Sequence, residues 1–265
     1  MIEQNLRKMA TFGVAGNFAG HLKQAGEEAG FAGVKTETAD APKALFPTYI
    51  PAAAAPTPAF LGVFPFDPAR IVFPRGESRL QIEPECALIC EADWAENRVT
   101  GLTPRFFAAS NDCSIRKEGA RKISEKKNWG PASKGLSACW LPVDRFAPGG
   151  ILDRYRIASF LVRGGVVHDY GEDSPVKGYS YFYERLITWL IEHLNHQQDA
   201  GPAEEIGAYL RQAGKPGQLM ISVGATRYTD FGEHNFLTDG DQAVVTVYPG
   251  DRYRHEQPSQ ASDCG

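Results

Sequence analysis

Glu83 and Glu85 stand two residues apart at the start of an apolar, β-prone run, in the segment IEPECALI at 82–89. Positions i and i+2 of a strand point to the same face, so we expect the two carboxylates to project side by side. A buried pair needs a shared proton or a cation between its members, whereas an exposed strand end can carry two solvated acids. A third acid, Asp112 in ASNDCSIR at 109–116, favours a metal site, because three carboxylates suit a hard divalent ion.

Length and composition limit the class of protein. The chain has 265 residues, enough for one large β-rich domain or two smaller ones, and 43% of them are hydrophobic. A net charge of -4 argues against a general nucleic-acid binder, and no apolar run approaches the ~20 residues that span a bilayer. The five cysteines form no Cys-x-x-Cys pair, which argues against a zinc site. We therefore expect a cytoplasmic protein.

The first half of the chain predicts short strands separated by loops. A strand from residue 11 breaks at Gly16-Asn17, and a helix follows on which Phe18, His21, Leu22 and Ala25 share one face, with Asn17 as its N-cap. Residues 39–59 are rich in proline and alanine and predict an extended loop. Further strands are predicted at 71–74, 80–82, 87–90 and 102–109.

The second half predicts both helices and strands. Residues 155–168 are typical of two strands joined at Gly164-Gly165. Apolar residues at helical spacing predict a helix over 179–195, and a second helix is predicted over 203–213. Strands are predicted at 219–223 and 243–248, and a polar tail follows the last of them.

A charge-rich segment lies between these halves, at 116–134, with six Lys or Arg residues between positions 116 and 127. For most of its lysines a solvated, mobile loop is the simpler interpretation. The functional interpretation is a lid that brings cations to an anionic substrate. We expect Arg116 and Lys134, at the two ends, to point inward.

In this order, the segments resemble the fumarylacetoacetate hydrolase (FAH) superfamily over most of the chain. Glu83-Pro84-Glu85 looks like that family's Glu-x-Glu metal motif, and 111–116 looks like its Asn-Asp-x-Ser-x-Arg segment. Lys134 falls where the family has an active-site lysine after a lid-like loop. Residues 236–241 resemble its closing Leu-x-x-Gly-Asp turn, 224–226 its Gly-Thr-Pro turn, and Asn17-Phe18-x-x-His21 the Asn-Tyr-x-x-His that supplies a catalytic histidine.

The resemblance implies an α+β, mainly β fold, with a mixed β-roll or sandwich core and peripheral helices. It implies one catalytic domain over residues 1–250, a polar tail over 251–265, and a homodimer. It also implies a set of site residues. Glu83, Glu85 and Asp112 would hold Mg²⁺ or Mn²⁺, His21, Lys134 and Arg116 would be catalytic, and Asn17, Ser114, Gly224 and Thr226 would contact the substrate.

The implied reaction is metal-dependent hydrolysis of a C–C bond in a small β-dicarbonyl or acylpyruvate-like acid, through a metal-stabilised enolate. As a lone histidine, His21 is also compatible with a structural role. The position three residues after it is Gln24, where the family often has a glutamate that polarises the histidine. Gln24 can orient an imidazole but cannot stabilise its cation as a carboxylate does, although Glu27 or Glu28 could substitute.

Three alternatives follow from this departure and from the charge-rich segment. One is a decarboxylase, isomerase or hydratase of 2-oxo acids in the same superfamily. Another is a metal-binding protein of this fold without turnover. Nucleic-acid binding through residues 116–127 ranks last because the whole chain is acidic. The expected partner is a small anionic metabolite, with no nucleic acid and no membrane.

Overall fold

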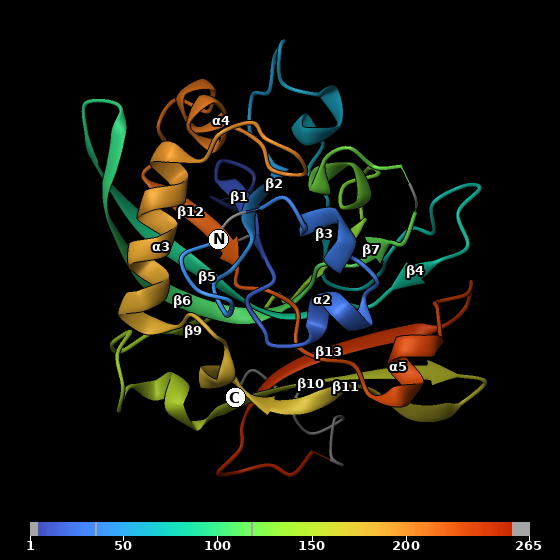
Figure 1. The fold of residues 1–265 in the computed structure, drawn as a ribbon. Helices are drawn as coiled ribbons and strands as arrows, with labels where there is room; N and C mark the ends of the chain where they lie inside the picture. Colours follow the sequence, from blue (N-terminus) through green and yellow to red (C-terminus); the bar gives the residue numbers. More distant parts are fainter. Residues whose placement is uncertain (1–4, 35, 118, 256–265) are drawn as a thin grey trace.

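A curved mixed sheet places the strands that carry the predicted metal ligands next to each other. The computed structural model describes residues 5–34, 36–117 and 119–255 (Figure 1). Seven of the eight strands follow the order β2-β1-β12-β5-β6-β8-β3, and β9 pairs with β6 beside this path. Their bounds are β1 Ala10–Ala15, β2 Ala44–Tyr49, β3 Phe66–Asp67, β5 Pro84–Ala95, β6 Arg98–Asn111, β8 Lys134–Leu136, β9 Leu141–Pro142 and β12 Gln218–Ser222.

Two smaller sheets and short helices surround the central sheet. The order β11-β10-β13 forms one small sheet, and β4 pairs with β7 in the other. The strands of these sheets are β4 Leu80–Gln81, β7 Ser114–Ile115, β10 Tyr155–Arg163, β11 Val166–Pro175 and β13 Gln242–Pro249. The α-helices are α2 His21–Gln24, α3 Tyr183–His196, α4 Ile206–Gln212 and α5 Asp230–His234, and the 3₁₀ turns are η1 Glu28–Phe31, η2 Ala59–Gly62, η3 Ile123–Lys126, η4 Ile151–Arg154 and η5 Val176–Gly178.

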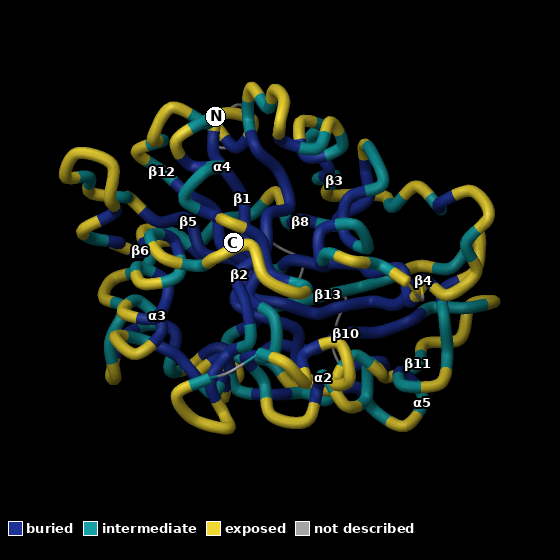
Figure 2. Tube along the Cα trace, turned by 45° about the horizontal axis from the view of Figure 1, so that its top comes forward, coloured by how far each residue is buried: buried dark blue, intermediate teal, exposed yellow. Residues whose placement is uncertain are grey.

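The long hairpin of β5 and β6 lies in the middle of the central sheet. The first seven residues of β5, from Pro84 to Cys90, are all buried, because β12 and β6 flank the strand on its two edges. Figure 2 shows buried residues along β1, β5 and β12 through the middle of the molecule. The hairpin therefore enters the core with a fixed pairing register, and its inner end positions the predicted site.

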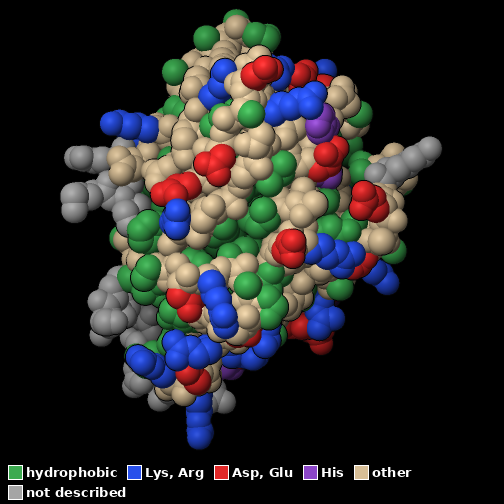
Figure 3. All heavy atoms as spheres, turned by 90° about the vertical axis from the view of Figure 1, so that its left-hand side faces the viewer, with side chains coloured by type: hydrophobic (Ala, Val, Ile, Leu, Met, Phe, Trp, Pro, Cys, Tyr) green, Lys and Arg blue, Asp and Glu red, His purple; other side chains and the backbone are tan. Residues whose placement is uncertain are grey.

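Helix α3 covers one part of this hairpin (Figure 1). Its buried Leu186, Leu190 and Leu194 recur every four residues, so they form one apolar face. At the end of the helix, the Asn195 side chain donates to the Val99 carbonyl and accepts from the Val99 N–H of β6, at 2.8 and 2.9 Å. The outer face around α3 carries interspersed charges of both signs (Figure 3), which is typical of a solvent-exposed surface.

The mainly β class and the elements of the second half confirm the sequence-based expectations. The predicted strand pair at 155–168 is β10 and β11, and the predicted strands at 219–223 and 243–248 are β12 and β13. The helix predicted from residue 179 begins at Tyr183. Of the predicted polar tail, residues 256–265 lie outside the described residues, and the single-domain expectation stays a prediction.

Two predictions in the first half are wrong. The helix after Asn17 has only four residues, because Gly20 and Gly26 bound it in the left-handed region at φ +84° and +67°. Gly20 is its N-cap, and Asn17 instead bonds to distant backbone. Residues 71–74 form no strand, although the Val72 N–H donates to the Ala132 carbonyl at 2.7 Å.

The proline- and alanine-rich segment 39–59 is also not simply a loop, because it contains the fully buried strand β2. Pro47 is tolerated within this strand because β2 is the outermost strand of the sheet order and pairs with β1 alone. Within the described part of the chain, no helix combines the length and the apolar character needed to cross a membrane.

Candidate metal and catalytic site

The pairing register of β5 and β6 brings Asp112 opposite Glu83. Pro84 pairs with Asn111, so Glu83, which precedes Pro84, lies opposite Asp112, which follows Asn111. The Asp112 N–H donates to the Glu83 carbonyl at 3.0 Å. Glu85 lies two residues along β5, on the same face as Glu83. Each of the three carboxylates is at most 4% exposed. The structure therefore brings together the three acids that the sequence predicts as metal ligands.

The donor set fits a hard divalent cation. Glu83, Glu85 and Asp112 each offer one carboxylate oxygen, and these oxygens all lie within 4.8 Å of one another. Oxygen-only donors suit Mg²⁺, Mn²⁺ or Ca²⁺ rather than softer ions. The three buried acids could thus bind a metal ion.

The turn after β12 supports Glu85. The Gly224 N–H donates to Glu85 Oε2 at 3.1 Å, and Gly224 has φ +114°, a conformation that favours glycine. A side chain there would also crowd the Val14 carbonyl, 3.0 Å from an ideal Cβ. Burial, followed by the charge of Asp112, raises the pKa of Glu85 well above its usual range, so this carboxylate needs a further cation to stay ionised.

Two lysines approach the carboxylates from the charge-rich segment. Lys127 Nζ lies 2.5 Å from Glu83 Oε2 and 2.6 Å from Asp112 Oδ2, the second contact without hydrogen-bonding geometry. Lys134 Nζ lies 3.0 Å from Asp112 Oδ1 and donates to the Cys113 carbonyl at 2.5 Å. Lys134 points inward as predicted, and Lys127, which the sequence assigns to a solvated loop, lies among the ligands.

Arg116 is held by four partners on three segments of the chain. It donates to Glu83 and Glu27 at 2.5 Å each, to Gln81 at 2.7 Å and to the Tyr228 hydroxyl at 2.9 Å. Its side chain is 5% exposed. The guanidinium thus fixes the orientation of Glu83, which favours a positioning role over direct contact with a substrate.

His21 stands beside Glu83, with Nε2 4.0 Å from Glu83 Oε1, and its ring packs against Tyr228 with centroids 5.1 Å apart. Its Nδ1 is buried without a hydrogen-bond partner. Burial lowers the pKa of His21 to about 4; the charge of Glu83 opposes this shift, and the charges of Arg116 and Lys127 add to it. The ring is therefore neutral at physiological pH and can accept a proton.

Of the three proposed helpers, Glu28 is exposed, and Gln24 and Glu27 bond to groups other than this ring. The Gln24 side chain donates to the Tyr228 carbonyl and accepts from the Tyr228 N–H, at 3.0 and 2.9 Å. Glu27 pairs with Arg116, and with Lys126 at 2.8 Å. Gln24 therefore ties α2 to the segment around Tyr228, and Glu83 is the carboxylate nearest to His21.

The residues expected to contact substrate are mostly engaged by the protein. Asn17 donates to the carbonyls of Tyr181 and Val223 and accepts from the Tyr181 N–H, so both of its amide protons are used. The Ser114 hydroxyl donates to the Asp112 carbonyl at 2.9 Å. The Thr226 hydroxyl, in contrast, is buried without a partner. Of these hydroxyls, that of Ser114 can still accept a hydrogen bond, and that of Thr226 can both donate and accept.

The segment 119–134 is ordered over the site rather than solvated throughout. Ile123, Ser124, Lys127 and Asn128 are buried. The Asn128 amide donates to the carbonyls of Thr48 and Val63, both at 2.9 Å. The prediction that most of its lysines form a mobile loop is wrong for Lys127, because fixed neighbours on both sides turn this side chain inward.

Glu204 bonds to the same segment, and its burial should make the free energy of unfolding depend on pH. It accepts from Ser124 at 2.9 Å and from Tyr209 at 3.2 Å, and burial raises its pKa from 4.5 to about 7. The folded state thus binds this proton more tightly, so the free energy of unfolding should fall as pH rises from about 4.5 to 7. From 1.36 kcal/mol per pKa unit, the contribution is about 3 kcal/mol.

Urea unfolding of the wild type and of Glu204→Gln at pH 5 to 8 measures the contribution of Glu204 to the free energy of unfolding. The stability difference between the two proteins should shift in favour of the variant as pH rises, because glutamine cannot ionise. A difference that stays constant with pH would show that Glu204 is ionised at neutral pH in the folded protein.

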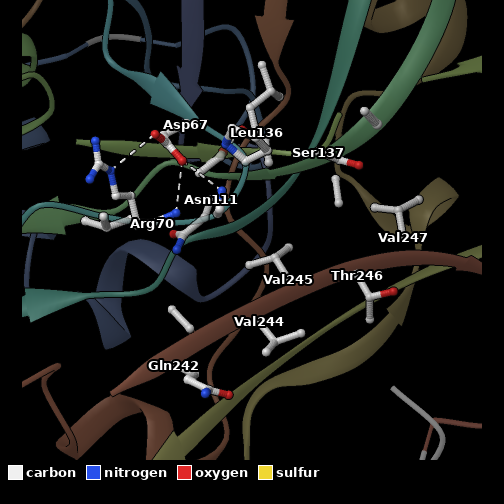
Figure 4. A pocket seen from close by; sticks show the side chains of 18 of the residues that line it. Asp67, Arg70, Asn111, Leu136, Ser137, Gln242, Val244, Val245, Thr246 and Val247 are labelled. Carbon is white, nitrogen blue, oxygen red and sulfur yellow. Dashed lines mark hydrogen bonds and ion pairs between the residues drawn. The ribbon is translucent and has the colours of Figure 1, made fainter. Parts of the chain in front are cut away.

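A cavity of about 790 Å³ lies apart from the carboxylates, between β6, β8 and β13. Figure 4 shows Asp67, Arg70 and Asn111 at one end of it and Val244, Val245 and Val247 of β13 along another wall. The lining residues include neither His21 nor any of the three acids. Because the site side chains are at most 8% exposed, a substrate reaches them only if a covering segment moves.

Comparison with solved structures defines the class of fold. The chain is similar to a protein of the fumarylacetoacetate hydrolase family from Yersinia pestis CO92, with 13% identity, a TM-score of 0.53, and coverage of 90% of this chain and 89% of that one. It is also similar to 2-keto-3-deoxy-D-arabinonate dehydratase complexed with magnesium and 2,5-dioxopentanoate, with 16% identity, a TM-score of 0.52, and coverage of 90% and 68%. At these identities the likeness establishes the FAH fold.

Within that fold the chain belongs to a family of unknown function, DUF5718, whose model matches residues 27–263. No curated protein matches the sequence. The matched range includes the three acids, Arg116, Lys127 and Lys134, whereas Asn17, His21 and Gln24 precede it.

Proposed function

We propose that this protein is a divalent-metal-dependent enzyme that hydrolyses a C–C bond in a small anionic β-dicarbonyl or acylpyruvate-like acid. The observation that carries the proposal is the convergence of Glu83, Glu85 and Asp112 in a buried site beside a neutral His21. FAH-fold neighbours that act on small oxo acids support the substrate class, since one of them holds magnesium and 2,5-dioxopentanoate.

Each group in the site would have a separate role in this reaction. A divalent ion held by the three acids would supply Lewis-acid polarisation of substrate oxygens; Mg²⁺ and Mn²⁺ accept the same ligands. The neutral imidazole of His21 would take a proton from the attacking water. As the C–C bond breaks, negative charge develops on the departing fragment as an enolate, and the Lys134 ammonium adds positive charge near it. The enolate then takes up the proton that His21 received from water, so one water is consumed and a carboxylic acid and a 2-oxo acid leave.

Arg116 and Tyr228 keep this arrangement rigid. Arg116 holds Glu83 in its orientation, and Tyr228 contacts both Arg116 and the ring of His21. Because Tyr228 is itself tied to Gln24, the base and the ligand Glu83 share one support. This support favours a fixed distance between proton acceptor and ligand, which general base catalysis requires.

Decarboxylation, isomerisation or hydration of a 2-oxo acid is the second candidate. The observation that favours it is that Gln24 and Glu27 bond to Tyr228, Arg116 and Lys126 rather than to His21. Without a carboxylate that pairs with His21 alone, the imidazole activates water less strongly. The homodimer and the cytoplasmic location expected from the sequence stay predictions.

Metal titration followed by a substrate screen tests the proposal. Calorimetry of metal-stripped protein with Mg²⁺ and Mn²⁺ should show binding that is lost in Glu83→Gln. Acylpyruvates and oxaloacetate are then assayed with and without ion, by loss of enol absorbance and by release of pyruvate. Ion binding without turnover of any acid would favour the metal-binding protein, and no ion binding would refute the metal-dependent reaction.

Replacing His21 with alanine should abolish hydrolysis while leaving ion binding within about threefold, because the ring lies 4.0 Å from Glu83 and supplies no predicted ligand. A loss of 10²–10⁴-fold in kcat is the usual effect of removing a general base. The measurement is kcat with the best substrate alongside calorimetry of the same preparation. Hydrolysis that survives the substitution would assign the base to another residue.

A further inference from the structure

Lysine and arginine side chains already occupy the surroundings of the buried acids. Four acids, Glu27, Glu83, Glu85 and Asp112, stand among four bases, Arg116, Lys126, Lys127 and Lys134. Arg116 and Lys126 neutralise Glu27, and Lys134 neutralises Asp112 from its Oδ1 side. A divalent ion added beside these side-chain cations would create an excess of positive charge in a site of low exposure, which is costly.

Lys127 differs from the other bases because its ammonium contacts two of the three proposed ligands. Its Nζ bridges one oxygen of Glu83 and one of Asp112, at 2.5 and 2.6 Å, and these two residues are metal ligands on the proposed function. An ion that binds both residues needs oxygens at about 2.0–2.1 Å, so it would meet the ammonium within a few ångströms. No other ammonium in the described cluster bridges two of the three ligands.

We propose that the Lys127 ammonium is a tethered cation that holds the divalent-ion position in the metal-free protein and withdraws when the ion binds. This inference rests on the metal-binding part of the proposed function. Lys127 directly follows η3, whose Ser124 is bonded to Glu204, and precedes Asn128, which is bonded to Thr48 and Val63. Withdrawal of the lysine therefore either extends its side chain away from the ligands or moves this stretch, and the latter also uncovers the buried site.

Removing the charge from Lys127 tests the competition. Lys127→Met removes the positive charge and keeps an unbranched side chain. Because the competing cation is gone, Mn²⁺ and Mg²⁺ should bind at least about tenfold more tightly, the scale of one charge-assisted hydrogen bond. Lys126→Met is the matched control: it loses the same charge at the adjacent position, but Lys126 contacts Glu27 rather than a ligand. Its affinity should stay within about threefold of the wild type.

A measurement on the unmodified protein covers the case in which Lys127→Met does not fold. Lysine acetylation followed by mass spectrometry, with and without saturating Mn²⁺, should show Lys127 protected in the stripped protein and reactive in the loaded one. Lys134 should stay protected in both states. Lys127 that stays protected while Mn²⁺ is bound would overturn the inference.

The outcomes separate this inference from the proposed function. Equal or weaker ion binding by a folded Lys127→Met, with clear binding by the wild type, would overturn the role of Lys127 and leave the metal-dependent reaction standing. An absence of ion binding in both proteins would overturn both. Tighter binding by Lys127→Met alone, together with exposure of Lys127 on loading, is the expected result.

Discussion

Replacing Asp112 with asparagine is expected to weaken Mg²⁺ and Mn²⁺ binding at least about a hundredfold while the protein stays folded. Loss of residues that only support metal ligands already costs 10–100-fold in affinity, and removing an anionic ligand should cost more. Asparagine keeps the shape of the side chain and one carbonyl oxygen, which can still accept from Lys134. The fold should therefore survive, although Lys127 loses part of its ionic environment.

Calorimetric titration beside a matched variant measures this effect. Asp93→Asn makes the same chemical change on the exposed half of β5, away from the site, and should bind ions as the wild type does. Circular dichroism of both variants checks the fold. Undiminished affinity in Asp112→Asn would remove Asp112 from the ligand set and, with it, the reason to place an ion at the end of the β5–β6 hairpin.

Replacing Arg116 with methionine should lower the free energy of unfolding by about 3–5 kcal/mol. The substitution leaves Glu83 and Glu27 buried with fewer positive partners, and removing one member of a buried ion pair typically costs that much. A loss of this size is a large part of the stability of an ordinary domain. Urea unfolding of the metal-free protein gives the change directly.

Arg105→Met provides the comparison for this experiment. Arg105 pairs with Glu91 at 2.7 Å, but the two side chains are 51% and 48% exposed, so its loss should cost under about 1 kcal/mol. Adding Glu83→Gln to Arg116→Met should recover part of the stability, because the uncompensated charge is then gone. If both arginine variants lose equally little, Glu83 and Glu27 are compensated by other groups.

The convergence of the three acids could be predicted because it depends on two paired strands. Alternation within β5 places Glu83 and Glu85 on one face, and the ordered segments of the resemblance supply Asp112. Strands such as β10, β12 and β13 were also predictable, since turn residues and apolar runs bound them. The inward position of Lys134 followed from its place at one end of the charge-rich segment.

Lys127 could not be predicted, because no spacing distinguishes it from Lys126 within one charge-rich run. Its direction is set by contacts of Asn128 and Ser124 with residues 65 to 80 positions away in the chain. The role of Gln24 was missed for a similar reason, since its partner Tyr228 is 204 residues distant. Strand β2 was missed because its tolerance of Pro47 depends on an edge position that only the sheet order reveals.

The site draws on segments from the whole length of the chain, from His21 and Glu27 through Glu83, Asp112 and Lys127 to Gly224 and Tyr228. An unfolded chain therefore holds these groups far apart and offers no preformed place for an ion. Binding is then confined to the native state and adds RT ln(1 + [ion]/Kd) to its stability by mass action. An upward shift of the melting temperature with Mn²⁺ concentration would thus report assembly of the complete fold, and this assay needs no knowledge of the substrate.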